Sequence, residues 1–200
     1  MDVARYVVAL IAVTAFPAAM VYWVLLHPFV RFWRRLGLLP SYVVLFGVFL
    51  AIIGVVYALR GRILAVEYGT NWYFVATAAV LFLAAQVLQG LAHRQLSFAT
   101  FVGVPELRPG GKDGRLLQEG VYARVRHPRY AAVMLGTLGM ALFTNYLAAY
   151  VLAAIALAWV FVIIALEERE LRDRFGDEYR EYQRRVPPLV PRRPRKRTTG

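Results

Sequence analysis

Apolar residues in this chain fall into long runs that charged residues interrupt. Three runs have the length of about 20 residues that a helix needs to cross a bilayer, namely Tyr6–Leu26, Ser41–Leu59 and Asn71–Ala92. The first is longer than the apolar core of a typical signal peptide, which has about 7–15 residues. The pattern therefore predicts three permanent membrane helices in the N-terminal half.

A fourth run, from Tyr130 to Leu166, holds no charged residue. As a single helix it would extend about 55 Å, whereas the hydrocarbon core of a bilayer is about 30 Å thick. Thr144 and Asn145 form a polar pair near its middle, so we expect a helical hairpin with spans at 130–143 and 146–166. The whole pattern predicts an all-α integral membrane protein with five transmembrane helices.

The composition supports a membrane environment and excludes cysteine chemistry. Hydrophobic residues make up 60% of the chain and charged residues 18%, and the mean hydropathy is +0.51. Soluble chains have roughly 45–50% apolar and about 25% charged residues, so 200 residues cannot bury this excess in one aqueous core. The sequence contains no cysteine, which excludes disulfides, thiolate nucleophiles and cysteine zinc sites.

The basic residues indicate how the chain is oriented. The net charge is +12, and 21 of the 24 Lys and Arg residues lie in segments 27–40, 93–129 and 167–200. Five spans place these segments on one side, which the positive-inside rule makes cytoplasmic. We therefore expect an external N-terminus, a cytoplasmic C-terminus, and an association of the charge with anionic lipid rather than nucleic acid.

The pattern divides the chain into three parts. An N-terminal three-helix region spans 1–92, and a core spans 93–190 with an irregular cytoplasmic loop, the hairpin and a helical tail. Residues 191–200 form a basic segment that we expect to be disordered and to face lipid. The tail has favourable i,i+4 ion pairs and an apolar stripe at helical spacing formed by Leu171, Phe175, Tyr179 and Tyr182. Gly176-Asp177 is expected to end one tail helix and cap the next.

Hairpin geometry concentrates charge at one end of the bundle. The start of the fourth helix, Arg126-His127-Pro128, must lie beside the end of the fifth, Glu167-Glu168. Proline suits the first helical turn and favours an extended conformation for the residue before it. These groups either form a functional site at the cytoplasmic membrane face or neutralise one another at the helix ends.

The third helix adds a polar face. Gln86, Gln89 and His93 are spaced at i, i+3 and i+7, and polar side chains within a bilayer generally face the bundle interior. They either form interhelical hydrogen bonds or line a substrate pocket at the level of His127. The three histidines are far apart in sequence, so no metal site is expected, and no phosphate-binding loop or nucleotide-binding sheet is expected.

Two motifs resemble those of a known superfamily. Residues 120–130 read GVYARVRHPRY, similar to the G-x-Y-x-x-x-R-H-P-x-Y signature of isoprenylcysteine carboxyl methyltransferases and their phospholipid methyltransferase relatives. Residues 167–182 read EERELRDRFGDEYREY and resemble the second signature, E-E-x-x-L-x-x-x-F-G-x-x-Y-x-x-Y. Two departures are Ala132, where many members have glycine, and the absence of arginine after Pro187-Pro188.

The resemblance implies an S-adenosylmethionine-dependent methyltransferase that acts on a lipidic or small hydrophobic acceptor at the cytosolic membrane face. The cofactor would contact residues of both motifs, namely Tyr122, His127, Pro128, Tyr130 and Glu167. Arg126 or Arg172 would orient an anionic acceptor, because guanidinium binds carboxylate bidentately. Glu168 or His127 would take a proton from an amine acceptor.

Four alternatives stay open from sequence. Related membrane enzymes methylate small thiols at sulfur or phospholipids at nitrogen, and sterol-reductase-like proteins share a related C-terminal architecture but use NADPH. The fourth alternative is a non-enzymatic membrane protein whose motifs are structural and whose basic tail binds lipid.

Overall fold

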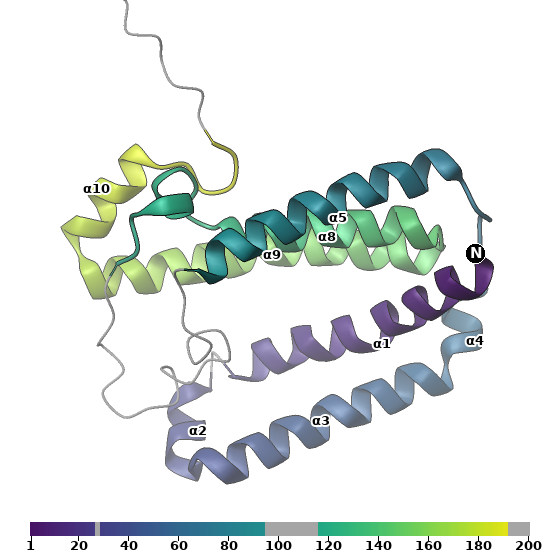
Figure 1. Ribbon diagram of the computed structural model, residues 1–200. Helices are drawn as coiled ribbons and strands as arrows, with labels where there is room; N and C mark the ends of the chain where they lie inside the picture. Colours follow the sequence, from purple (N-terminus) through teal and green to yellow (C-terminus); the bar gives the residue numbers. More distant parts are fainter. Residues whose placement is uncertain (27–28, 95–115, 192–200) are drawn as a thin grey trace, which may run out of the picture.

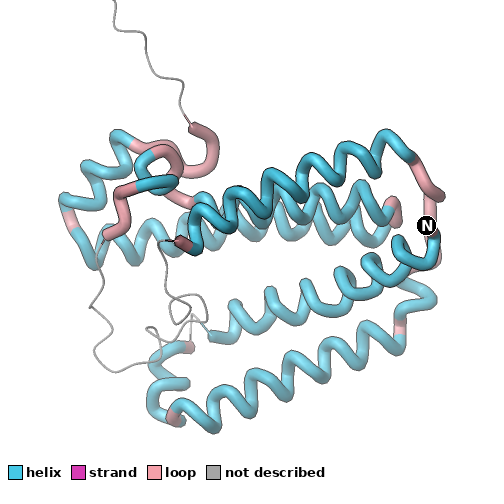
Figure 2. The backbone as a smooth tube through the Cα atoms, in the orientation of Figure 1, coloured by secondary structure: helices cyan, strands magenta, loops and turns pink. Residues whose placement is uncertain are grey.

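The computed structural model describes residues 1–26, 29–94 and 116–191. The regular structure of these residues is helical (Figures 1 and 2). The helices are α1 (Asp2–Leu26), α2 (Val30–Leu36), α3 (Leu38–Ala58), α4 (Arg60–Ile63), α5 (Trp72–His93), the 3₁₀ turn η1 (Gly120–Ala123), α8 (Pro128–Thr144), α9 (Leu147–Phe175) and α10 (Asp177–Arg185). Much of the predicted cytoplasmic loop (95–115) and nearly all of the basic tail (192–200) lie outside the described residues.

Four of the described helices are long and apolar enough to cross a membrane: α1, α3, α5 and α9. The length and apolar composition of these helices indicate that the chain is an integral membrane protein. The fourth predicted span corresponds to α8, which has 17 residues and is shorter than these four. α1 continues through Pro17, and it begins four residues earlier than its apolar run.

The helices form two groups that run side by side (Figure 1). In one group α8 packs against both α5 and α9, and in the other α1 packs against α3; α1 also contacts α8 and α9. The α5–α8 contact is close at Gly139, where an added Cβ would lie 3.2 Å from the Ala78 carbonyl oxygen and 3.3 Å from the Leu81 Cβ. A glycine at this position thus allows the two helix backbones to approach, as is common in membrane bundles.

The predicted hairpin is confirmed at its turn. α8 ends at Thr144, Asn145 adopts the left-handed conformation with φ 54° and ψ 44°, and α9 begins at Leu147. Asparagine tolerates this conformation because its short polar side chain can hydrogen-bond locally, and here it donates to the Gly69 carbonyl at 2.9 Å.

The predicted end of the fifth span at residue 166 is wrong for the helix itself, because α9 continues to Phe175 as one helix. The charged residues after the apolar run sustain it through pairs such as Glu168–Arg172, whose ion-pair distance is 3.9 Å. Gly176, with φ 58°, ends α9 and directly precedes α10. Asp177 is the first residue of α10 rather than its N-cap, and it pairs with Arg180 at 2.7 Å.

A buried arginine joins the helices at the end where the N-terminus lies. Arg5 is fully buried, and its guanidinium stacks over the Tyr146 ring at 5.7 Å. Its polar partners come from α1, the 64–71 segment and the end of α8, and they are the Asp2 carboxylate (3.1 Å), the Thr70 hydroxyl (3.0 Å), the Glu67 carboxylate (2.9 Å) and the Thr144 carbonyl (3.0 Å). This cluster fastens α1 to the tip of the hairpin.

Replacing Arg5 with leucine is expected to lower the free energy of unfolding by about 2 kcal/mol, the scale of charged hydrogen bonds lost from a buried site. Thermal denaturation in detergent measures the loss. Arg35 is exposed, so Arg35→Leu serves as a control that should melt like the wild-type protein. Equal melting temperatures for the two variants would show that the Arg5 cluster does not stabilise the fold.

Candidate functional site

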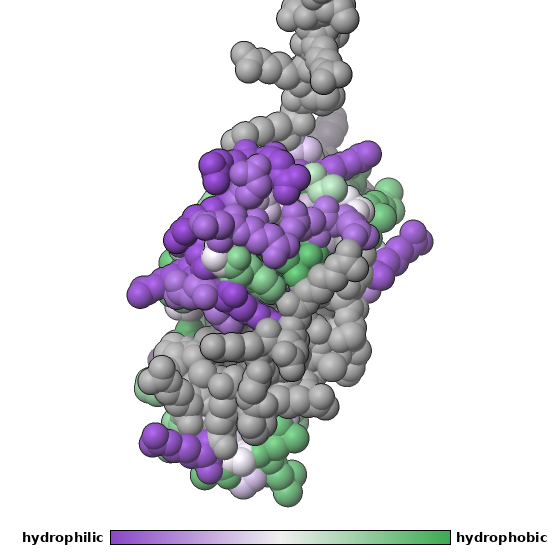
Figure 3. Space-filling view, turned by 90° about the vertical axis from the view of Figure 1, so that its left-hand side faces the viewer, coloured by the Kyte–Doolittle hydropathy of each residue, from purple (hydrophilic) through white to green (hydrophobic). Residues whose placement is uncertain are grey.

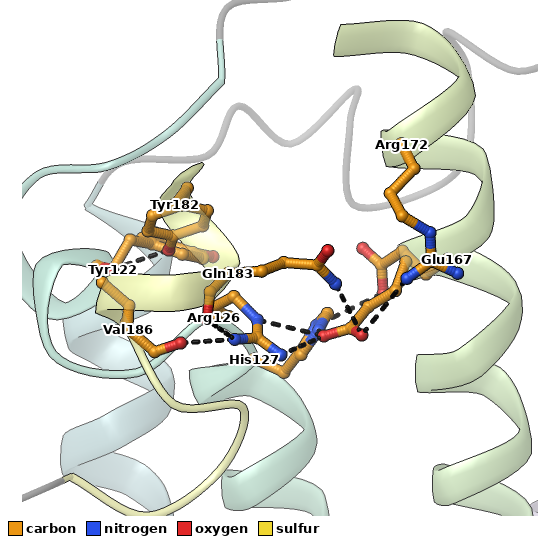
Figure 4. A network of polar contacts seen from close by, with 9 residues as sticks. Tyr122, Arg126, His127, Glu167, Arg172, Tyr182, Gln183 and Val186 are labelled. Atoms are coloured by element: carbon orange, nitrogen blue, oxygen red, sulfur yellow. Dashed lines mark hydrogen bonds and ion pairs between the residues drawn. The ribbon is translucent and has the colours of Figure 1, made fainter. Parts of the chain in front are cut away.

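The two motifs meet at the end of the hairpin opposite the Arg5 cluster. Pro128 occupies the first turn of α8, and His127 is the N-cap residue with φ −122° and ψ 59°. The φ value agrees with the predicted extended conformation, but ψ is smaller than an extended strand would have. Antiparallel packing then places Glu167 and Glu168 of α9 beside Arg126 and His127 (Figure 4).

The carboxylate of Glu168 is the centre of a polar network. Its Oε1 accepts hydrogen bonds from Arg126 through Nη2 (2.6 Å) and Nε (3.0 Å) and lies 3.1 Å from Nε2 of His127. Its Oε2 accepts from the Gln183 side chain at 2.9 Å. Because a carboxylate only accepts, Nε2 of His127 is the donor, and Glu168 holds three side chains in one orientation.

The C-terminal segment closes over this network. The backbone N–H groups of Arg126 and His127 donate to the carbonyls of Pro187 and Pro188, each at 2.9 Å. Nη1 of Arg126 donates to the Gln183 carbonyl at 2.9 Å and also to the Val186 carbonyl. Figure 3 looks onto this end of the molecule, where hydrophilic side chains gather over the charged helix α10.

Three tyrosines line the same region, Tyr179 and Tyr182 from α10 and Tyr122 from η1. The Tyr182 hydroxyl donates to the Tyr122 carbonyl at 2.7 Å, and burial raises the pKa of Tyr182 to about 12, so the phenol keeps its proton at neutral pH. Burial also raises the pKa of Tyr122 to about 12. Burial, with the nearby Glu168 carboxylate, raises the pKa of Tyr179, whose buried hydroxyl has no hydrogen-bond partner among the described residues.

Glu167 differs from Glu168 in that one of its oxygens is unused. Oε2 of Glu167 is buried and accepts no hydrogen bond from the described residues, and it lies 3.7 Å from Nδ1 of His127. An unsatisfied buried carboxylate oxygen is costly. The arrangement therefore suits a ligand that brings a positive charge or an N–H donor to this point.

The structure brings most of the predicted site residues together. The Tyr130 ring lies 5.7 Å from the His127 ring, Tyr122 is buried, and Arg172 lies at the edge of the network, 38% exposed. The polar face predicted on α5 is more exposed to solvent than the motif residues are. Gln86 and His93 are exposed and Gln89 is half-buried. Gln89 and His93 are joined by a 2.9 Å hydrogen bond within α5.

Two contributors were missed by reasoning from the sequence. Gln183 reaches Glu168 from α10. One helical turn before it, Tyr179 has a buried hydroxyl that makes no hydrogen bond to any residue described in the structure. Their i,i+4 spacing places both residues on the same face of α10. Because Tyr179 belongs to the predicted apolar stripe, the spacing was a signal that Gln183 also faces the bundle. Among the described residues, no group of three His, Asp or Glu side chains is arranged to hold a metal ion.

Comparison with known families agrees with the position of these motifs. The family model for phospholipid methyltransferases matches residues 73–178, more than half of the chain. The chain belongs to the phospholipid methyltransferase family. The match begins in α5 and ends in α10, so it includes the whole hairpin, the first motif and residues 167–178 of the second motif.

Relatives of known name match shorter parts of the chain. A methanethiol S-methyltransferase of Bradyrhizobium diazoefficiens is 45% identical over 72 residues, 36% of this chain and 24% of that protein. A cobalt-zinc-cadmium resistance protein of Cupriavidus metallidurans is 38% identical over 84 residues, 42% of this chain and 38% of that protein. A protein-S-isoprenylcysteine O-methyltransferase of Schizosaccharomyces pombe is 36% identical over 85 residues, 40% of this chain and 36% of that protein.

The matched segments thus span about a quarter to two fifths of the length of these relatives. The named methyltransferases differ in the atom that receives the methyl group, sulfur in one and oxygen in the other. No solved structure matches the chain significantly.

Proposed function

We propose that this protein transfers a methyl group from S-adenosylmethionine to a lipidic or hydrophobic acceptor at the cytoplasmic membrane face, in the manner of isoprenylcysteine carboxyl methyltransferases. The observation that supports this function best is the junction of the two motifs, where Glu168 organises Arg126 and His127 while Oε2 of Glu167 accepts no hydrogen bond from the residues that the structure describes. Family membership supports methyl transfer as the reaction class.

The proposed membrane arrangement has five spans, with α8 as the short fourth span beside α5 and α9. A short span is compatible with a bilayer because local thinning and flanking polar residues accommodate the mismatch. The N-terminus is external and the motif junction cytoplasmic, as the distribution of basic residues favours. Residues 1–92 form the N-terminal three-helix region, 93–190 the methyltransferase core, and 191–200 a lipid-facing basic segment.

The residues at the junction fit S-adenosylmethionine. This cofactor supplies an electrophilic methyl group on a sulfonium and also has an ammonium group, so it needs anionic partners. Glu167 has a buried oxygen that accepts no hydrogen bond within the described part of the chain, and we assign this oxygen to the positive charge of the cofactor. Tyr122, His127, Pro128 and Tyr130 form the rest of the proposed binding surface, and the backbone after α10 covers it.

Of the three residues predicted to act on the acceptor, Arg172 keeps that role in the proposal. Arg172 is partly exposed at the edge of the network, 3.9 Å from Glu168, and it would orient an anionic acceptor bidentately. Arg126 and Glu168 were also predicted to act on the acceptor, but their side chains are occupied with each other and with the tail. We therefore propose that these two position His127 and the tail, while exclusion of water by the covering segment favours methyl transfer.

The chemical class of the acceptor decides whether the reaction needs a base. A carboxylate or thiolate is already nucleophilic and needs only orientation, whereas an amine must lose a proton to a base such as His127. The 45% identity to a methanethiol S-methyltransferase favours a thiol as the second candidate. In either case Gln86, Gln89 and His93 are proposed to line the route of the acceptor along α5.

Product analysis tests this function. The protein, purified in detergent, is incubated with methyl-labelled S-adenosylmethionine and separately with a prenylated cysteine, a phospholipid mixture and small thiols. We expect label in a methyl ester or a thioether, and the substrate that is labelled identifies the acceptor atom. Absence of label in all three, combined with binding of NADPH, would replace the proposal with a reductase.

A further inference from the structure

An apolar groove lies between α1, α3, α4 and the first turns of α9. Its volume is about 380 Å³, and its walls include Val13 and Pro17 of α1, Val56 of α3, and Val151 and Ile155 of α9. Ile155 precedes Glu167 by 12 residues of continuous helix, which corresponds to about 18 Å along the axis. The groove is therefore separate from the motif junction and lies toward the opposite end of the bundle.

The surroundings of the groove are those of a lipid site. Three of the helices that form it, α1, α3 and α9, are long and apolar enough to span the membrane. Val151 and Ile155 are about half exposed, at 51% and 53%. Since an apolar cavity of about 150 Å³ already binds benzene, a groove of about 380 Å³ has room for a segment of an acyl chain.

Among the described residues, Arg62 is the one charged residue that lines the groove. It is exposed on α4, directly after the apolar run of α3 ends. If α3 spans the membrane, Arg62 follows the end of the span and lies at the level of the lipid headgroups. Among the residues that the structure describes, no carboxylate is within ion-pair distance of Arg62. Its neighbour Arg60 is instead satisfied locally, by the Tyr57 ring at 4.2 Å and the Tyr57 carbonyl at 2.9 Å.

We propose that this groove binds an anionic phospholipid, with an acyl chain along its apolar walls and the headgroup phosphate paired with Arg62. Guanidinium groups bind phosphate bidentately. Arg62 supplies the charge at the groove and α4 contains no acidic residue to offset it, so the site prefers a net negative headgroup to a zwitterionic one. This site is independent of methyl transfer and rests only on the membrane location of the helices.

Native mass spectrometry of the protein, reconstituted from equal amounts of phosphatidylglycerol and phosphatidylcholine, tests the proposal. We expect the wild-type protein to retain phosphatidylglycerol preferentially. Arg62→Gln should reduce that retention about tenfold, the scale of one charged hydrogen bond. Arg60→Gln is the matched control, because it removes the same charge from the same helix, and it should retain phosphatidylglycerol like the wild-type protein.

Filling the groove tests the acyl chain separately. Ala148→Phe and Val151→Phe each place a ring in the groove while leaving Arg62 intact, and whichever variant melts like the wild-type protein should lose phosphatidylglycerol about as strongly as Arg62→Gln. The proposal is overturned if Arg62→Gln and Arg60→Gln behave alike, if the folded groove variant keeps the lipid, or if the wild-type protein shows no preference for phosphatidylglycerol.

Discussion

Replacing Glu168 with alanine is expected to lower the free energy of unfolding by about 3 kcal/mol, because breaking a buried ion pair from one side leaves an uncompensated charge. The charge that would be left is Arg126, whose side chain is only 9% exposed. His127 and Gln183 would lose an acceptor as well. Thermal and chemical denaturation in detergent measure the change.

The matched control is Glu170→Ala, which removes an exposed carboxylate from the same helix and should leave the melting temperature unchanged. A second variant separates charge from packing. In the double variant Arg126→Met/Glu168→Leu both partners become apolar, so part of the lost stability should return, while binding of S-adenosylmethionine should not. If Glu168→Ala melts like Glu170→Ala, Glu168 is not the centre of a stabilising network.

Replacing Glu167 with glutamine is expected to affect cofactor binding rather than stability. It should weaken binding of S-adenosylmethionine by roughly 10- to 100-fold, the scale of a hydrogen bond to a charged group, and leave the melting temperature unchanged. The reason is that Oε2 of Glu167 accepts no hydrogen bond from the described residues and its side chain is 41% exposed. Equilibrium binding of radiolabelled cofactor measures the effect.

Glu170→Gln provides the matched control, because Glu170 is an exposed glutamate three residues after Glu167 on α9 and lies outside the network. It should bind the cofactor like the wild-type protein. Undiminished binding by Glu167→Gln would assign the positive charge of the cofactor to another residue. A large fall in its melting temperature would instead show that Glu167 supports the fold.

The hydrophobic pattern was sufficient to predict the hairpin and the meeting of the two motifs at its end. The turn at Thr144-Asn145 followed from the length of an uncharged run, and antiparallel packing then required Arg126 and His127 to meet Glu167 and Glu168. All of these positions are confirmed. The pattern was informative here because an apolar run that exceeds the bilayer thickness has to turn back, and only one polar pair was available.

The sequence could not predict which of the two glutamates pairs with Arg126 and which keeps an oxygen for a ligand. Adjacent residues on a helix point about 100° apart, and which of them meets the arginine depends on the rotation of α9 against α8. The contribution of Gln183 depends on how the chain turns at Gly176, whose φ of 58° is a local property that redirects α10. The fifth helix was predicted to end at residue 166, where the apolar run ends, but the charged residues after it stay helical through side-chain pairs, so α9 ends at Phe175.

Calorimetric titration of the detergent-purified protein tests the central claim most directly, with S-adenosylmethionine and NADPH as separate ligands. The account predicts saturable binding of S-adenosylmethionine to the wild-type protein, weaker binding to Glu167→Gln, and no binding of NADPH. Binding of NADPH without binding of S-adenosylmethionine, or saturable binding of neither ligand, would contradict it.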